Sequence, residues 1–141
     1  MYKQEEHFNM NKTNMGKRVK KRFDISVTDA DTVHSKTFDL DKNIIALHGI
    51  LFTADRDDLL YYRGTGKVEI NRQEIFPEGY ECKLVMTGLN VSPNDRYYHL
   101  GGMLPGNGKF KVEYKDNLEE RLLFSPYRVS VYLDCEINEQ A

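Results

Sequence analysis

The chain has 141 residues, of which 40% are hydrophobic and 30% charged, and its formal net charge is −2. This length fits one domain with one core, and the mean hydropathy of −0.63 is that of a globular chain with a wetted surface. The longest apolar run, residues 44–52, is far too short to cross a bilayer, so no contact with a membrane is expected. The N-terminus lacks the apolar core and cleavage site of a secretory signal, so secretion by a signal peptide is not expected either.

Positive charge is concentrated near the N-terminus. Residues 1–22 contain seven Lys or Arg against two Glu, a charge of +5, so the other residues must carry −7 for the chain to reach −2. Up to about Gly16 the sequence is polar and has no hydrophobic period, which is typical of a segment that buries too little apolar surface to fold. We therefore expect a basic extended arm over residues 1–21 and a β-sandwich domain over residues 22–141.

From residue 22 onward, apolar and polar residues alternate with a period of two. The alternation is clearest at residues 23–27, 110–114 and 129–137. A helix is excluded there, because residues two apart would point to different sides of it. Further strands are expected at residues 33–40, 44–53, 59–62, 67–70, 80–87 and 96–100, with turn-forming Gly, Pro, Asn and Asp between them. One helical turn is expected at residues 118–123.

Residues 44–52 are apolar without alternation, which indicates a central strand covered on both faces. Gly49 within it marks a bulge or a close approach of another backbone. A strand buried on both sides needs a second layer. Eight or nine short strands therefore predict an all-β fold, a two-sheet antiparallel β-sandwich of jelly-roll type with an extended N-terminal arm.

Residues that could carry chemistry form no recognisable constellation. No histidine is spaced from a Cys, Asp or Glu as metal ligands are; the four are His7, His34, His48 and His99. Cys82 and Cys135 lie in alternating apolar segments and are expected to be buried free thiols, with a disulfide as the lesser alternative. Two glycine-rich stretches, residues 64–67 and 106–109, lack the spacing of a phosphate loop. The sequence thus predicts no catalytic residue, no cofactor and no metal, and hence no enzyme.

The basic run before the first strand is the main candidate contact segment of the arm. Its five cations are Lys17, Arg18, Lys20, Lys21 and Arg22. Such a run can neutralise phosphates of a nucleic acid without reading its sequence. It can equally lie on an acidic neighbouring subunit, or be an ordinary solvated segment. The sequence leaves these three interpretations open.

Tyrosine is the one compositional excess: there are nine, with no Trp. Two adjacent pairs, Tyr61-Tyr62 and Tyr97-Tyr98, would each place one ring on either face of a strand, and exposed tyrosines favour interfaces. The loop that contains Met103 and Leu104 adds apolar side chains. These six residues are the candidate interface, although tyrosines also simply suit strands.

A charged N-terminal arm followed by eight or nine short strands resembles the small single jelly-roll and related β-sandwich proteins of virions. These include the capsid vertex (penton) and capsid decoration subunits of bacteriophages. The resemblance implies a non-enzymatic structural subunit, a homo-oligomer whose arm contacts neighbouring subunits or packaged nucleic acid. It also implies location in the virion, and in the host cytoplasm during assembly. Two alternatives stay open: a monomeric module that binds a glycan or peptide, and an enzyme whose site is not recognised.

Overall fold

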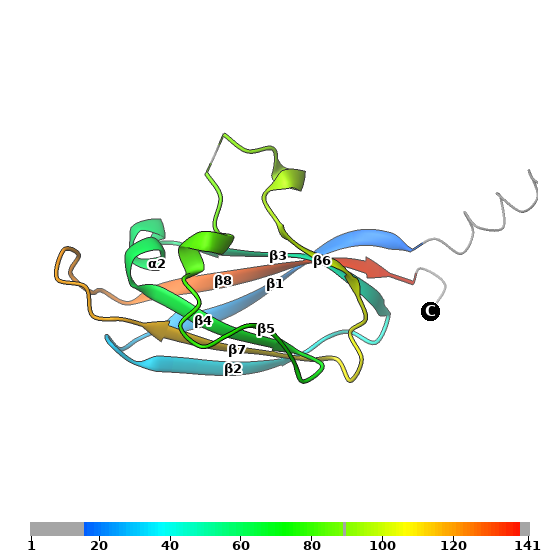
Figure 1. Cartoon of the computed structure of the whole chain (residues 1–141), viewed down its shortest axis with the longest axis horizontal. Helices are drawn as coiled ribbons and strands as arrows, with labels where there is room; N and C mark the ends of the chain where they lie inside the picture. Colours follow the sequence, from blue (N-terminus) through cyan, green and yellow to red (C-terminus); the bar gives the residue numbers. More distant parts are fainter. Residues whose placement is uncertain (1–15, 89, 139–141) are drawn as a thin grey trace, which may run out of the picture.

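A computed structural model describes residues 16–88 and 90–138 of the chain (Figure 1). Within these residues there are eight strands, one α-helix and two short 3-10 helices. In chain order they are β1 (Lys17–Val27), β2 (Val33–Asp39), β3 (Ile44–Ala54), α2 (Asp57–Arg63), β4 (Gly64–Ile70), β5 (Gln73–Phe76), η1 (Cys82–Val85), η2 (Pro93–Asp95), β6 (Tyr98–Met103), β7 (Lys109–Asp116) and β8 (Tyr127–Ile137).

The strands form two four-stranded antiparallel sheets that face each other. The first sheet has the order β1-β8-β3-β6 and the second has the order β2-β7-β4-β5. The first strand therefore pairs with the last, the second with the seventh, the third with the sixth, and the fourth with the fifth. A long antiparallel ribbon rolled up so that β8 meets β3 and β7 meets β4 gives this order, which is that of an eight-stranded jelly roll. The predicted all-β fold, a two-sheet antiparallel β-sandwich, is confirmed.

The core lies between the two sheets and follows from the predicted alternation. Val131 and Leu133 of β8 point inward, as do Phe110 and Val112 of β7, and all four are fully buried. The polar residues between them face outward, because successive side chains on a strand point to opposite faces. Cys82 and Cys135 are both buried and free, as expected.

Strand β3 lies between β8 and β6, and its register shifts between Leu47 and Gly49. This is the bulge predicted at Gly49. A Cβ added there would lie 2.7 Å from Cβ of Tyr97, so glycine lets the chain at residue 97 pass close to the strand. Phe52 lies in the core, and its neighbour Leu51 on the opposite face is buried as well. This part of β3 is therefore covered on both faces, as predicted.

The strand predicted at residues 59–62 is wrong, because these residues belong to the helix α2. Leu59, Leu60 and Arg63 are buried, a spacing that fits one helical face, while Tyr61 and Tyr62 are exposed. Acidic residues in the first turn and Arg63 in the last turn suit the helix dipole. The two tyrosines thus share one exposed surface instead of opposite faces of a strand.

Other local predictions also need correction. Residues 80–87 contain the 3-10 helix η1 in place of a strand, residues 118–123 form a turn that is not helical, and residues 64–66 begin β4 instead of making a turn. Strand β5 was not predicted. It follows a two-residue hairpin loop in which Asn71 and Arg72 both have positive φ, 53° and 61°.

The predicted boundary between arm and domain is too late in the chain. β1 begins at Lys17, and its register with β8 runs from the pair Lys17 and Ile137 onward. The basic run therefore belongs to the first sheet. What was predicted for residues 1–15 falls outside the described residues.

A buried polar network connects α2, β7 and β8. Arg63 donates from Nη2 to Oδ2 of Asp116 at 2.8 Å, and the two side chains are 2% and 0% exposed. The hydroxyl of Tyr127 donates to Oδ1 of Asp116 at 2.8 Å. Tyr114 lies 2.6 Å from that hydroxyl and must be the donor to it, since the Tyr127 proton is already engaged. The backbone N–H of Asp31 donates to Asp116 as well.

The network sets the charge state of Asp116. Burial by itself raises the pKa of this carboxyl, but the hydrogen bonds from Arg63, from the Asp31 N–H and from Tyr127 outweigh burial and leave the pKa below its ordinary value. Asp116 is therefore ionised and paired with Arg63 inside the protein.

Replacing Gly64 should test how tightly this network is packed. A Cβ at Gly64 would lie 2.5 Å from the hydroxyl oxygen of Tyr114 and 2.7 Å from the carbonyl oxygen of Leu60. We expect Gly64→Ala to lower the free energy of unfolding by about 1–3 kcal/mol. In the control Gly66→Ala, the new Cβ would meet Cys82 Sγ at an ordinary 3.5 Å. The control should change stability by less than about 1 kcal/mol in urea unfolding, and equal losses would contradict the close approach at Gly64.

Removing the carboxylate of Asp116 should be far more costly. Asp116→Ala leaves the Arg63 charge buried without a counter-ion, and we expect a loss of about 3–5 kcal/mol. Tyr127→Phe removes one hydrogen bond to the same carboxylate and should cost about 1–3 kcal/mol.

The same pair predicts sensitivity to acid. Because the folded-state pKa of Asp116 is lowered, its stabilisation is complete above the ordinary value of about 3.9 and is lost as the pH falls below it. The free energy of unfolding, measured with urea, should therefore fall more steeply for the wild type than for Asp116→Ala as the pH drops below about 4. Parallel pH profiles of the two proteins would show that the carboxyl is not paired.

Candidate functional site

The outer face of the first sheet brings together two of the predicted cations. Register places Lys20 opposite Asp134 and Arg18 opposite Glu136 on β8. Arg18 Nη2 lies 2.6 Å from Oδ2 of Asp134, and Lys20 Nζ lies 3.1 Å from Oδ1 of the same carboxylate. The Asp134 side chain is 11% exposed, whereas those of Arg18 and Lys20 are 52% and 42% exposed. The two cations thus share one shielded counter-ion.

This arrangement fixes the ionisation of Asp134. Burial alone raises the pKa of this carboxyl, but the hydrogen bonds from Arg18 and Lys20 outweigh burial and lower the pKa below its ordinary value. Next to it, the Lys20 ammonium lies 5.4 Å from the ring centre of Tyr97. Partial burial raises the pKa of the Tyr97 hydroxyl, and the Asp134 charge adds to this effect. Tyr97 is therefore a neutral neighbour of the cations.

His48 adds a contact that sequence reasoning missed. Its Nε2 lies 2.8 Å from Oε1 of Glu136, and both side chains are partly exposed. The alternation of β8 could place Glu136 on the outer face, but the unpatterned apolar segment around the Gly49 bulge gave no direction for His48. A shallow hollow of about 420 Å³ lies over this part of the sheet. Its lining residues are Arg18, His48, Asn94, Tyr97, His99, Gly101 and Asp134.

The acidic side chains at this hollow have partners on the same face of the sheet. Asp134 is neutralised by Arg18 and Lys20, and Glu136 accepts the hydrogen bond of His48 if that nitrogen carries the proton. Among residues 16–88 and 90–138, no group of three or more His, Cys, Asp or Glu side chains is arranged to hold a metal ion. Two further residues of the basic run also have acidic partners: Lys21 lies 3.0 Å from Asp41, and Arg22 lies 2.8 Å from Asp24.

A second candidate surface lies at the α2 end of the sandwich, where large apolar side chains are exposed. We call it the leucine–tyrosine end: Tyr61, Tyr62, Leu84, Leu118 and Leu123, which are 47%, 50%, 60%, 71% and 86% exposed. They come from α2, η1 and residues 117–126, and contacts join these segments. The Lys83 ammonium lies 5.8 Å from the ring centre of Tyr61, and the Arg121 guanidinium lies 5.2 Å from that of Tyr62. Figure 1 shows α2 and the orange loop before β8 at this one end.

A polar hollow of about 580 Å³ adjoins the leucine–tyrosine end, with Tyr61, Tyr62 and Leu118 in its lining. Two cations in its lining form ion pairs with acidic residues of the same lining: Lys83 lies 2.9 Å from Glu81, and Arg121 lies 2.8 Å from Glu119. The Arg121 hydrogen bonds lower the pKa of Glu119 to about 2, so this carboxylate stays charged. The hollow therefore offers aromatic rings beside compensated charges.

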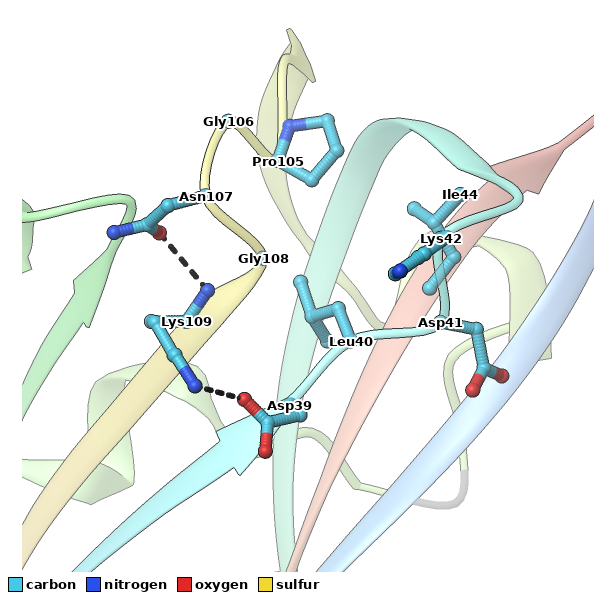
Figure 2. Close-up of a pocket in the computed structure, with 10 residues that line it drawn as sticks. All are labelled: Asp39, Leu40, Asp41, Lys42, Ile44, Pro105, Gly106, Asn107, Gly108 and Lys109. Carbon is cyan, nitrogen blue, oxygen red and sulfur yellow. Dashed lines mark hydrogen bonds and ion pairs between the residues drawn. The ribbon is translucent and has the colours of Figure 1, made fainter.

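The opposite end of the sandwich carries a smaller hollow of about 390 Å³ between residues 39–44 and 105–109 (Figure 2). Leu40 and Ile44 are its buried apolar part. Figure 2 shows the Lys109 amine directed at Asp39, with which it forms an ion pair, while the Asp41 carboxylate points toward β1. Both acidic side chains of this hollow therefore have basic partners, Asp39 with Lys109 and Asp41 with Lys21.

The structure separates the predicted interface residues into distinct places. Tyr61 and Tyr62 belong to the leucine–tyrosine end, whereas Tyr97 borders the hollow on the outer face of the first sheet. Tyr98 is 45% exposed, and its ring packs edge-on against Phe76 at 5.1 Å. Of the loop pair, Met103 packs partly against the core and Leu104 is 72% exposed.

Comparison with known proteins adds no relative. No family model matches the chain, and neither a curated protein nor a solved structure matches it. None of the helices in the described ranges has the length and apolar character that crossing a bilayer requires.

The shared counter-ion on the outer face can be tested by neutralising it. Asp134→Asn leaves Arg18 and Lys20 without their shielded partner, and we expect a loss of about 1–3 kcal/mol in the free energy of unfolding. Asp41→Asn is the matched control, because it removes the exposed pair with Lys21 and should cost less than about 1 kcal/mol. Chemical denaturation at low salt measures both, and a larger loss in the control would contradict the arrangement described.

Proposed function

We propose that the chain is a non-enzymatic structural subunit of a larger assembly, a capsid vertex or decoration protein of a bacteriophage virion. The observation that carries the proposal is the strand order, β1-β8-β3-β6 over β2-β7-β4-β5, because the eight-stranded jelly roll is a recurrent fold of viral capsid domains. The same fold also serves lectins and cupins, so the fold alone supports a class of proteins and not one member.

The leucine–tyrosine end supports assembly as the role of this jelly roll. Of the nine large apolar side chains that are exposed among the described residues, five lie there. Exposed apolar side chains gathered on one surface mark sites of protein contact more than scattered ones do. Tyr and Arg are also enriched at interfaces, and Tyr62 lies under Arg121 in this surface. We therefore assign subunit contacts to this end first.

The position of the basic run helps to decide between two proposed contacts of the N-terminal segment, one with neighbouring subunits and one with packaged nucleic acid. Five of the seven N-terminal cations lie in β1, so residues 1–15 retain Lys3 and Lys12 against Glu5 and Glu6, with no net charge. Of the five, Arg18, Lys20, Lys21 and Arg22 already have acidic partners within the domain. Contact with neighbouring protein is therefore favoured over contact with packaged nucleic acid.

The second candidate function, a module that binds a glycan or peptide, rests on the hollow beside Tyr61 and Tyr62. Aromatic rings with polar neighbours are suited to such ligands. A saturable ligand bound by a strictly monomeric protein would favour this role over assembly.

Assembly through the leucine–tyrosine end can be measured by light scattering over rising protein concentration. We expect the full chain to form larger species and the double variant Leu118→Lys/Leu123→Lys to stay monomeric, because two exposed apolar contacts become charged. The control Leu104→Lys changes an equally exposed leucine at a different place and should associate like the wild type. Monomers at every concentration for all three proteins would remove the support for self-assembly through this end.

A further inference from the structure

Within the part of the chain that the structure describes, β1 is an edge strand whose second side has no strand partner in its own sheet. It pairs with β8 along its whole length, and it stands at the end of the order β1-β8-β3-β6. In an antiparallel pair, successive residues direct their N–H and C=O groups alternately toward the partner and away from it. Every second residue of β1 therefore offers both groups to the open edge.

Hydrogen bonds on β8 identify which residues these are. The N–H of Asp55 donates to the carbonyl oxygen of Arg128 at 3.2 Å, so even-numbered residues of β8 face β3 and odd-numbered ones face β1. The register pairs odd with odd, for example Val19 with Cys135. Odd-numbered residues of β1 thus bond to β8, and even-numbered ones point to the open edge. Consistently, the N–H of Thr28, just after β1, donates to Nε2 of His34 on β2.

Side chains of β2 cover only the later part of this edge. His34 accepts the Thr28 N–H at 3.2 Å, and the Lys36 ammonium lies 3.5 Å from the carbonyl oxygen of Asp24. Earlier in β1, the outward backbone groups of residues 18, 20 and 22 have no hydrogen-bond partner among the described residues. In Figure 1 this part is the blue start of β1, which lies beside the red end of β8.

The side chains along this part define what a further strand must look like. Arg18, Lys20 and Arg22 stand in a row on the outer face and remain 42–52% exposed. On the inner face, Val19 and Phe23 pack partly against the core. The strand already paired with this segment matches it: β8 places Glu136 and Asp134 opposite the first two cations and apolar Cys135 between them. Opposite charges directly across two strands are stabilising.

We propose that the open edge of β1 at residues 18–22 binds an extended segment of a partner protein in which acidic and apolar residues alternate. The segment adds a fifth strand to the first sheet. Its backbone bonds to the outward N–H and C=O groups of residues 18, 20 and 22, its acidic side chains lie beside the three cations, and its apolar side chains extend the inner face beside Val19. This site is separate from the leucine–tyrosine end, so it stands whether or not the chain is a virion subunit.

The test uses the full-length protein and a synthetic peptide of alternating Glu and Val with blocked ends. Binding is measured by fluorescence anisotropy of the labelled peptide at low and high salt. Lys20→Pro removes the outward N–H without removing a bond to β8, because a proline is tolerated where the N–H of an edge strand faces outward. Lys20→Ala is the matched control, which removes the same charge and keeps the N–H. Arg18→Pro and Arg18→Ala form a second pair nearer the strand end, and thermal unfolding verifies that each variant is folded.

We expect saturable binding that weakens with salt, and a proline variant that binds about tenfold more weakly than its alanine control, the equivalent of one main-chain hydrogen bond. A peptide with the same composition but all Glu residues before all Val residues should bind much more weakly. Equal binding by proline and alanine variants, or by both peptides, would overturn the proposal. An absence of any binding would do so too, and would leave the cations as charges that keep the edge from pairing.

Discussion

The buried pair of Arg63 and Asp116 is the interaction on which the rest of the fold depends. It joins the end of α2 to the end of β7, and through Tyr127 it reaches the start of β8 in the other sheet. An ion pair shielded from water is stabilising only when its geometry and remaining hydrogen bonds are satisfied. Here the guanidinium also donates to the carbonyl oxygen of Leu122, which holds the loop before β8 against α2. Gly64 leaves the space that Tyr114 needs to complete the chain of hydrogen bonds.

The buried pair of Arg63 and Asp116 also positions the surface that we assign to assembly. The leucine–tyrosine end is built from α2, η1 and residues 117–126, and the first and last of these are connected by Arg63. Its exposed leucines are therefore carried by segments that a buried interaction holds in place. A contact surface fixed before binding loses less conformational entropy when a partner docks. The second proposed contact, at the open edge of β1, depends instead on strand register and lies on a different part of the molecule.

The two proposed contact surfaces would use different physical means of recognition. The leucine–tyrosine end offers apolar area and aromatic rings, so the partner that we propose for it would be recognised by burial and shape. The edge of β1 offers directed backbone groups beside a row of cations, so the partner segment that we propose would be recognised by hydrogen bonding and by charge. A subunit of a shell must meet neighbours in more than one direction, and two unlike surfaces would serve that need without competing for one partner.

The sequence by itself determined the all-β class, the inward residues of β1, β7 and β8, the bulge at Gly49 and the buried free thiols. Each of these follows from a period of two or from one residue's local geometry. It could not place α2, because the Leu and Tyr residues at 59–62 suit either a strand or a helix. The helix is fixed by the ion pair of Arg63 with Asp116, which is 53 positions away in the sequence. It missed β5, because Asn71 and Arg72 adopt positive φ without the usual glycine. The basic run at residues 17–22, predicted to lie before the first strand, is part of β1, since β8 supplies acids opposite the cations more than 110 positions away. Strand order, the pairing of His48 with Glu136 and the open edge of β1 were decided by tertiary structure alone, because contacts between distant residues leave no local pattern.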